Sequence, residues 1–509
     1  MEEIDCRIHT LGVIRRAEDS RTWWSVRAGS GVHPRRHFFS PLVLAMPETL
    51  SAPHPATRAP VTPPTELPPP RTPEPELVIH GVDLAGQVYF AGDRVFRIVR
   101  PEGAGVVKKI IEEGLFEALR GHGVVRTWVS VQDDGGIVLE HERIPFVTHP
   151  AEWTPQMVRE AARFLVTLNL KLHAHGLMLK DPHLLNVTFH RGRPVFLDFG
   201  SIVPFDRWLS KAWVKGFRSS VLTAVWLGRW KGGKLASAML QSEPRGLGYE
   251  LSRVFPLNLV PFSAHVAVFL ARIGKWESAL WFLEKRLSPK VLRSPYNLWN
   301  DYGTAIAEEE KQLKRQVIYD EVRRSRPASL HELAGNQAVI GEQIVRELGI
   351  PVCSTDYVPH CVQQAWERTR EANLPLQVGV VDLLFPVSPC SIGGSSRPGA
   401  MERLQAETTL ATALVHHLVA LKETSMDGFV AILSAYSLKS TIVEWVDASD
   451  KYLKFWKKDG KRFPEDYTEE GFLAAFGKEF PHVRELPRHH DHRKLFHFSR
   501  VPFEDGGRE

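Results

Sequence analysis

The C-terminal part of the chain, from about residue 323 to residue 503, alternates short apolar runs with amphipathic stretches. Residues 329–333 have the pattern of a short buried strand, and residues 339–348 place apolar side chains at helical spacing before Gly349. A second strand pattern follows at residues 351–354. Strands that alternate with helices predict βαβ units and a parallel sheet. This alternation constrains the fold most, and it predicts a Rossmann-like α/β domain over residues 323–503.

Acidic residues stand at the ends of three successive predicted strands. Glu332 ends the first strand, Asp356 follows the second, and Asp382 follows a third apolar run at residues 377–381. In Rossmann-like folds a carboxylate at the end of the second strand binds ribose hydroxyls. The acid after the third strand commonly faces an adenine amino group in methyltransferases. Each acid could instead be an ordinary surface residue at a strand end.

The turn between the first strand and its helix reads Ala-Gly-Asn-Gln at residues 334–337. Small residues there let a ligand approach the backbone and the helix N-terminus. The signature G-x-G-x-x-G is absent, which lowers the case for NAD and favours a nucleoside without phosphates, such as S-adenosylmethionine. The predicted cofactor-binding residues are Glu332, Ala334, Gly335, Asn336, Asp356 and Asp382.

A second motif lies at residues 175–201. Asp181 and Asn186 have D-x-x-x-x-N spacing, and Asp198-Phe199-Gly200 follows a predicted β-hairpin. Protein kinases and antibiotic phosphotransferases use this arrangement, in which the first Asp accepts a hydroxyl proton and the Asn and later Asp hold magnesium. The pattern predicts a kinase-like module over residues 77–205, with Thr154-Pro155 as a helix start.

Phosphoryl transfer also needs a glycine-rich loop and a strand lysine beside the phosphates. The glycines at positions 81, 86 and 92 do not form that loop, and the relevant strand, residues 95–100, carries arginine (Arg97 and Arg100) where lysine is expected. Arginine keeps the charge but cannot copy a compact ammonium. We therefore expect a degenerate module that holds or orients a ligand. The alternatives are a small-molecule kinase that uses Mg-ATP, and a binding scaffold in which both sites have decayed.

The rest of the chain divides by composition. Residues 41–76 are dense in proline, so residues 1–76 should form a mostly disordered tether. Residues 206–322 are mainly helical in pattern, and residues 323–327 look like a short linker. The predicted fold class is multidomain α+β and α/β, with a kinase-like N-terminal module, a helical middle and a Rossmann-like C-terminal domain.

Composition and charge exclude several classes of protein. A net charge of +5 over 509 residues is too weak to argue for nucleic acid or an anionic membrane. Only four cysteines occur, none with C-x-x-C spacing, which fits a reducing cytoplasm, and no apolar run is long enough to span a membrane. A late histidine cluster could hold a metal, but the Asp and Arg between its members favour a solvated turn without one. That cluster is His489, His490, His492 and His497.

Several blocks of sequence, in a fixed order, carry a family resemblance. They are Asp83-Leu84-Ala85-Gly86, Glu140-His141-Glu142, Pro150-Ala151-Glu152-Trp153, Leu179-Lys180-Asp181, Pro194-Val195-Phe196-Leu197-Asp198, Glu332-Leu333-Ala334-Gly335-Asn336-Gln337, Leu414-Val415-His416-His417-Leu418 and Phe463-Pro464. With them the chain resembles bacterial class I S-adenosylmethionine-dependent methyltransferases similar to the nodulation protein NoeA. The resemblance implies a class I methyltransferase fold at the C-terminus and cofactor contacts at Gly335, Asp356 and Asp382. Two departures are Ala338, where such turns often carry a second glycine, and Glu332, where aspartate is commoner.

Methyl transfer requires little catalytic equipment, because the sulfonium already makes the methyl group electrophilic and the protein mainly aligns donor and acceptor. A base is needed only if the acceptor must lose a proton. His416 and His417 follow the predicted fourth strand and are the candidate catalytic residues, although either could instead pack in the core. The expectation is a cytoplasmic methyltransferase with a small-molecule or glycan-like acceptor and no nucleic-acid partner. The sequence leaves its oligomeric state open.

Overall fold

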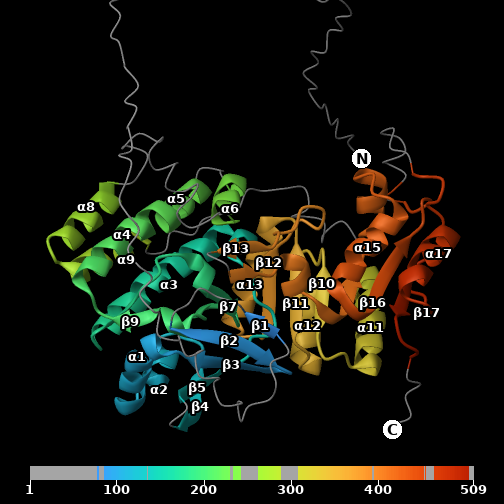
Figure 1. Ribbon diagram of the computed structural model, residues 1–509. Coiled ribbons are helices and arrows are strands. Elements are labelled where there is room, and N and C mark those ends of the chain that lie inside the picture. The colour runs from blue at the N-terminus through green and yellow to red at the C-terminus, as the bar shows by residue number, and fades with distance from the viewer. Residues whose placement is uncertain are drawn as a thin grey trace, which may run out of the picture. The chain divides into compact units, whose positions relative to one another are not determined.

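The structure is a computed structural model that describes residues 77–79, 85–133, 136–229, 233–241, 262–287, 308–392, 395–451, 453 and 463–503. These residues belong to one compact unit (Figure 1). The segment 1–76, predicted to be disordered, lies outside the described residues, as does Gly81.

The N-terminal part of the unit is a five-stranded antiparallel sheet in the order β1-β2-β3-β5-β4. Its strands are β1 (Leu77–Ile79), β2 (Gly86–Ala91), β3 (Arg94–Val99), β4 (Thr127–Asp133) and β5 (Gly136–His141). The helical pattern after β3 is two helices, α1 (Pro101–Glu112) and α2 (Phe116–Gly121). Gly114 separates them because its φ of 63° is left-handed, which glycine adopts without strain.

Helix α3 (Pro155–His173) begins at the predicted position, where the Met157 N–H donates to Thr154 Oγ1 at 3.3 Å. Two short antiparallel pairs follow it: β6 (Leu177–Leu179) with β9 (Ile202–Pro204), and β7 (Val187–His190) with β8 (Arg193–Phe196). The β7–β8 turn has positive φ at Arg191 and Gly192, as a two-residue hairpin turn requires. The predicted hairpin between Asn186 and Asp198 is therefore confirmed.

The described part of residues 206–325 is helical. It comprises α4 (Arg207–Phe217), α5 (Thr223–Arg229), α6 (Gly233–Gln241), α8 (Phe262–Arg272), α9 (Trp276–Leu287) and α11 (Glu308–Ser325). The predicted linker at residues 323–327 is wrong at its start, because α11 continues through Ser325. Arg323 and Arg324 favour the last helical turn, since cations are stabilised at a helix C-terminus.

The C-terminal part is a seven-stranded sheet in the order β12-β11-β10-β15-β16-β18-β17. Only β18 runs antiparallel to its neighbours. The strands are β10 (Leu330–Leu333), β11 (Val352–Asp356), β12 (Leu376–Val380), β15 (Ala406–Ala411), β16 (Ser437–Val446), β17 (His482–Glu485) and β18 (Arg493–Ser499). The predicted alternation of strands and helices and the predominantly parallel sheet are confirmed over these residues.

Helices cover both faces of this sheet (Figure 1). Ile442 of β16 belongs to the core shared with α11, α12 (Val339–Leu348) and α13 (Pro359–Glu371). The next residue, Val443, belongs to the core on the opposite face. The helices on that face are α14 (Ala400–Arg403), α15 (Met426–Tyr436) and α17 (Glu469–Glu479). Successive strand residues point to opposite faces, so each face has its own apolar core.

The N-terminal, helical and C-terminal parts pack into one another. One continuous apolar core contains Leu165, Leu280 and Leu376, which come from the three parts in turn. Glu152 and Arg403 form a buried ion pair between the first and third parts at 2.5 Å. A fragment cut at residue 322 would expose these surfaces, so experiments require the full chain. Among the described residues, no helix is both long and apolar enough to cross a bilayer.

Candidate functional site

The strand order reverses direction beside β10. From β10 the chain adds β11 and β12 on one side, then returns to add β15 and β16 on the other. In open parallel sheets of this kind, ligands bind outside the carboxyl ends of the strands at that reversal. Two segments flank it, residues 334–338 after β10 and residues 412–416 after β15. The predicted cofactor and catalytic residues therefore meet at one edge of the sheet.

The turn after β10 is wound by three left-handed residues that are not glycine. Ala334 and Asn336 have φ of 52° and Ala338 has φ of 58°. Each such residue costs about 1–2 kcal/mol unless it is glycine or, in part, asparagine. Strained backbone of this kind persists where packing enforces it, and it clusters at functional sites. The Ala338 N–H donates to the Gly335 carbonyl at 2.8 Å, which closes the turn.

Gly335 lies in this turn with no room for a side chain. A Cβ there would come within 2.7 Å of the Glu332 carboxyl carbon and collide with Ser354 Oγ. From the sequence, a small residue at position 335 was predicted to let a ligand approach the backbone. The structure shows a further reason for glycine at this position, because the turn packs directly against Glu332 of β10 and Ser354 of β11.

Glu332 lies beneath the turn and is buried. Its Oε2 accepts a hydrogen bond from Ser354 Oγ at 2.7 Å and one from the Gly341 N–H at 3.3 Å. Burial raises the pKa of Glu332 to about 7, although both hydrogen bonds favour the ionised form. The Glu332 carboxyl therefore packs against Gly335 in the turn and binds the start of the following helix through the Gly341 N–H.

Asp356 at the end of β11 faces the same turn. Its Oδ2 accepts from the Asn336 N–H and its Oδ1 from the Val358 N–H, both at 2.7 Å. Burial raises the pKa of Asp356 to about 6. Each carboxylate oxygen can accept a second hydrogen bond, so this side chain still has acceptor capacity for a ligand hydroxyl.

Asp382 lies close to Asp356, because the Val381 N–H donates to the Asp356 carbonyl at 3.1 Å. One oxygen of Asp382 accepts from the Leu384 N–H at 3.0 Å. Two exposed aromatic residues follow these acids: Tyr357 is 50% exposed and Phe385 is 81% exposed. Neither was predicted from the sequence; for Tyr357, a large aromatic directly after a strand-end acid was the available signal, whereas Phe385 stands three residues after Asp382.

The other side of the reversal carries His416 and His417, whose ring centroids are 4.3 Å apart. Burial lowers the pKa of His416 well below its usual value and that of His417 to about 4. Both imidazoles are therefore neutral at pH 7. A group with so low a pKa is a weak general base near neutrality, because the best catalytic pKa lies near the working pH.

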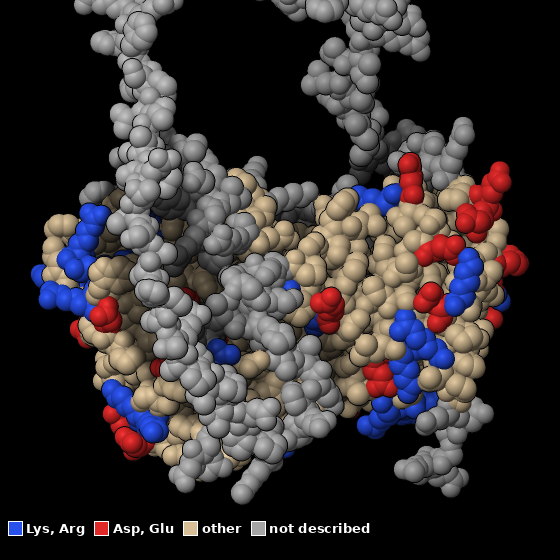
Figure 2. Space-filling model, in the orientation of Figure 1, with Lys and Arg blue, Asp and Glu red and all other residues tan. Residues whose placement is uncertain are grey.

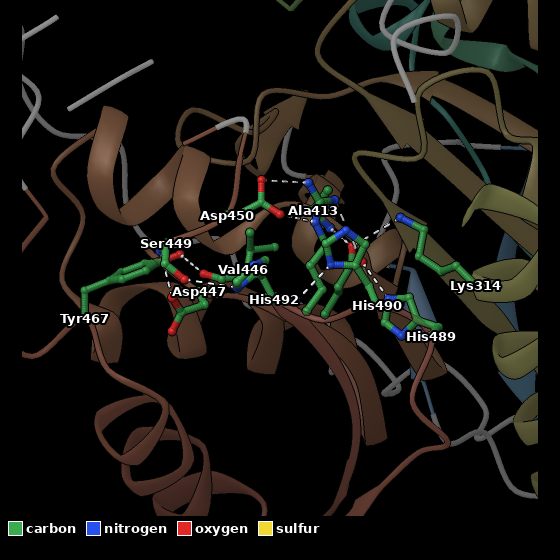
Figure 3. Close-up of polar contacts among 12 residues, drawn as sticks. Lys314, Ala413, Val446, Asp447, Ser449, Asp450, Tyr467, His489, His490 and His492 are labelled. Atoms are coloured by element: carbon green, nitrogen blue, oxygen red, sulfur yellow. Dashed lines mark hydrogen bonds and ion pairs between the residues drawn. The ribbon is translucent and has the colours of Figure 1, made fainter. Parts of the chain in front are cut away.

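The segment that carries these histidines is held by Glu444, which is fully buried near the end of β16. Figure 3 labels three of the residues that contact its carboxylate: Lys314, Ala413 and His489. Its Oε2 accepts from the Ala413 N–H at 2.7 Å and pairs with Lys314 Nζ at 3.2 Å. Its Oε1 contacts His489 Nε2 at 3.1 Å. Burial alone would raise the pKa of Glu444, but Lys314 and His489 outweigh it and lower that pKa far below its usual range. Sequence reasoning missed this residue, although a charge within the apolar run at residues 441–446 was a signal.

The late histidines occupy three different environments. His489 is buried against Glu444, and His497 is buried with its Nδ1 2.6 Å from Glu321 Oε1. His492 is exposed in the turn before β18, where its backbone N–H donates to His490 Nδ1 at 3.0 Å. The four side chains therefore do not converge on one point.

The kinase-like residues do converge. Ser201 Oγ lies 2.8 Å from Asp181 Oδ2 and 2.5 Å from Asp198 Oδ2, and Asn186 Nδ2 donates to the same Asp198 oxygen at 3.1 Å. Arg97 pairs with Asp198 Oδ1 at 3.0 Å. Burial alone would raise the pKa of Asp198, but Arg97 and the Ser201 hydroxyl outweigh it and lower that pKa. A protein cation and a hydroxyl thus occupy the positions around Asp198, and sequence reasoning missed the serine.

Comparison with known proteins gives one relative over most of the chain. The nodulation protein NoeA of Rhizobium meliloti (strain 1021) is 23% identical over 468 residues, which cover 84% of this chain and 92% of the relative. No protein-family model matches.

Solved structures give weaker likenesses. Magnesium protoporphyrin IX methyltransferase (ChlM) of Synechocystis PCC 6803, with bound SAH, is 12% identical over 43% of this chain and 92% of its own, with a TM-score of 0.27. The methyltransferase domain of bacterial CtHen1 is 10% identical over 37% of this chain and 98% of its own, with a TM-score of 0.29. Monomeric WbdD is 12% identical over 38% of this chain and 41% of its own, with a TM-score of 0.27. Scores this low do not establish a shared fold.

Proposed function

We propose that this chain is a class I S-adenosylmethionine-dependent methyltransferase that acts on a small-molecule or glycan-like acceptor. The observation that carries the proposal is the arrangement at the strand reversal, where a tight left-handed turn and acids at successive strand ends share one edge of the sheet. Its sequence resemblance to NoeA-like methyltransferases points to the same cofactor.

The side chains at this edge fit a nucleoside. Asp356 has acceptor capacity for ribose hydroxyls, and Asp382 would face the adenine amino group. Tyr357 and Phe385 offer exposed aromatic faces beside these two acids, where a purine can stack. Gly335 and its neighbours Ala334 and Asn336 would line the side toward the amino-acid part of the cofactor. When bound, the cofactor supplies an activated methyl group, so the protein has only to align the acceptor with it.

His416 and His417 stand on the acceptor side of the same edge. Because they are neutral, they can accept or donate a hydrogen bond and so orient an acceptor group without repelling a sulfonium. Strong general-base catalysis by either residue is not expected. Acceptors that react without prior loss of a proton, or whose proton is acidic, suit this arrangement.

Calorimetric titration of the full-length protein with S-adenosylmethionine and S-adenosylhomocysteine tests the proposal. Stacking on an aromatic side chain contributes about 1–3 kcal/mol, so Tyr357→Ala or Phe385→Ala should each weaken binding by roughly 5- to 150-fold. Both side chains are largely exposed, so neither change should unfold the protein. Trp128→Ala, at a side chain 40% exposed on β4, is the matched control. A full-length protein that binds neither compound overturns the proposal.

Gly335→Ala provides a second test, because the added Cβ collides with the ends of β10 and β11 and must displace the turn. We expect loss of cofactor binding in this variant. Gly477→Ala is its control, since a Cβ at Gly477 has nothing within 4 Å. Equal affinities for the two variants would show that the turn does not form the binding site.

For the kinase-like module we propose a degenerate role, in which it holds or orients a ligand without phosphoryl transfer. The Arg97 guanidinium pairs with Asp198 Oδ1, and a protein cation there disfavours magnesium beside the same carboxylate. Mg-ATP should therefore not be hydrolysed, and it should produce no heat on titration. Magnesium-dependent turnover that disappears in Asp198→Ala would instead establish the small-molecule kinase.

A further inference from the structure

The described helices of the middle region expose several large apolar side chains. On α4 Trp208 is 75% exposed, and on α9 Trp281 is 57% exposed. Phe269 at the end of α8 is 59% exposed, and Ile273 directly after α8 is 47% exposed. We call Trp208, Phe269, Ile273 and Trp281 the helical patch. Isolated exposed apolar residues are ordinary, but several on packed neighbouring helices mark an interaction surface.

One contact joins the start of α4 to the end of α8, where three residues of the helical patch lie. The Arg207 guanidinium lies so close to Gly274 that a Cβ on this glycine would collide with it. Trp208 follows Arg207 and Ile273 precedes Gly274 in the chain. Phe269 lies one turn before Ile273, since the Ile273 N–H donates to the Phe269 carbonyl at 3.1 Å.

The surface beneath this junction is closely packed. Trp276 is buried there, with its ring centroid 5.8 Å from that of Trp213 and 6.2 Å from that of Phe205. Trp213 in turn stacks on Phe217 at 4.9 Å. The exposed aromatic side chains therefore stand on a packed aromatic layer, and binding would not have to order the backbone that carries them.

The positive charge of the chain is concentrated around these helices. Residues 206–218 and 262–287 contain eight Lys and Arg against three Asp and Glu, whereas the whole chain carries only +5. One of the three acids, Glu284, is already paired with Arg163 of α3 at 2.7 Å. Figure 2 shows Lys and Arg side chains gathered at the end of the molecule where Figure 1 places α8.

From these observations we infer that the helical patch docks on an anionic lipid surface. Tryptophan prefers the interface between water and lipid, because its ring is apolar and its N–H polar. Lys and Arg side chains extend past apolar neighbours to reach anionic headgroups. Exposed tryptophans among basic residues on a closely packed helical surface satisfy both requirements. An acidic protein would attract the basic residues equally well, but it would not specifically favour exposed tryptophans beside them. This inference does not depend on the proposed catalytic function.

Sedimentation of the full-length protein with sucrose-loaded vesicles tests the inference. Vesicles of phosphatidylcholine with roughly one-third phosphatidylglycerol should carry the protein into the pellet at low salt, and less so as salt rises. Pure phosphatidylcholine vesicles should bind it at least about tenfold more weakly, because each basic residue near an anionic surface contributes roughly fivefold. Tryptophan fluorescence should shift to shorter wavelength in the presence of the anionic vesicles.

Two double variants separate apolar from electrostatic docking. Trp208→Ser with Phe269→Ser removes the exposed rings, and Arg272→Glu with Lys275→Glu reverses two exposed charges. Each pair should reduce the partition onto anionic vesicles at least about tenfold. The control pair is Lys108→Glu with Arg120→Glu, which makes the same change of charge on exposed positions of α1 and α2.

Three outcomes would overturn the inference. One is that the wild type stays in the supernatant with anionic vesicles at low salt. Another is that the control pair weakens binding as much as the pair at Arg272 and Lys275. The third is concentration-dependent self-association, without vesicle binding, that the change at Trp208 and Phe269 abolishes. That result would assign the helical patch to a protein interface.

Discussion

The exchange of Glu332 for glutamine tests the electrostatics of the candidate cofactor turn. Burial raises the pKa of Glu332 from 4.5 to about 7. Each tenfold change in proton affinity is worth about 1.4 kcal/mol, so this shift corresponds to a contribution of roughly 3 kcal/mol. Below about pH 4.5 the carboxyl is neutral in both the folded and the unfolded chain, and its contribution to stability is fully present. As the pH rises from 4.5 to 7 that contribution is lost, because only the unfolded chain releases the proton freely.

Glutamine keeps an oxygen that can accept from Ser354 Oγ and from the Gly341 N–H, but it carries no charge. Glu332→Gln should therefore be close to wild type in stability near pH 4.5. At pH 8 we expect the variant to be more stable than wild type by about 1–3 kcal/mol. Denaturant unfolding followed by circular dichroism at several pH values measures this difference. Buried acids that do not interact with Glu332 contribute equally to both proteins and cancel in the comparison. Asp356 does interact with it and raises its pKa further, so part of the difference at high pH is the relief of this repulsion.

Glu347→Gln is the matched control, because Glu347 is exposed on the neighbouring helix α12. It should change stability by the same small amount at every pH. If Glu332→Gln and wild type keep a constant difference in unfolding free energy from pH 5 to pH 8, the buried carboxyl is not protonated as argued. The explanation of how the turn is supported would then be wrong.

Three further changes test other parts of the fold and site, each by denaturant unfolding. Ala334→Gly should stabilise the protein by about 0.5–1 kcal/mol, because glycine adopts a left-handed φ without strain. Ala338→Gly should be near neutral, because it relieves the same strain but also removes a fully buried methyl group. An Ala334→Gly protein that is less stable than wild type would contradict the strain argument. Glu444→Gln should destabilise the protein by about 3–5 kcal/mol at pH 7, because it breaks a fully buried charged network. The pKa of Glu444 is lowered in the folded chain, so this loss of stability should shrink only in acid. A loss below about 1 kcal/mol at pH 7 would refute the structural role of Glu444. Arg403→Ala should lower the free energy of unfolding by a similar amount, because it leaves Glu152 buried without its cation. Arg346→Ala, which removes the more exposed Arg346–Glu342 pair of α12, should lower it by less than about 1 kcal/mol. Equal losses of stability in the two variants would show that the Glu152–Arg403 pair does not link the first and third parts.

Local signals were enough to predict the elements that position the site. The turn after Leu333 and the helix from Val339 follow from short-range pattern, because their periodicity and end signals lie within a few residues. The same holds for Thr154, whose side chain caps α3 three residues later. The apolar pattern of residues 105–119 predicts one helix because it continues on both sides of Gly114, whereas the structure breaks there into α1 and α2.

Contacts between distant residues could not be read from the sequence. Ser201 meets Asp181 across 20 residues, Glu444 meets Lys314 across 130, and Glu152 meets Arg403 across 251. Nothing in the local pattern identifies such partners, because pairing depends on how whole elements pack. These same contacts decide the chemistry: they determine which carboxyls are ionised, which are neutralised by protein cations, and whether the parts of the chain can be separated.

The turn at residues 334–338 shows why a search for a glycine signature can miss a glycine-like conformation. The signature records which residue adopts a left-handed backbone most cheaply, whereas the ligand would contact the backbone itself. Here Ala334, Asn336 and Ala338 adopt that backbone at a cost of a few kcal/mol in all. Glu332 and Asp356 can supply the compensation, since each accepts a backbone N–H from this turn or from the start of the next helix. The acids at the strand ends therefore stabilise the fold in the absence of any ligand. Asp356 differs from Glu332 because its two oxygens accept from two different N–H groups, those of Asn336 and Val358. Asparagine has only one acceptor oxygen, so Asp356→Asn leaves one of these N–H groups unpaired. Measured near pH 5, where the raised pKa of Asp356 leaves little charge to remove, the variant should have a lower melting temperature than the wild type.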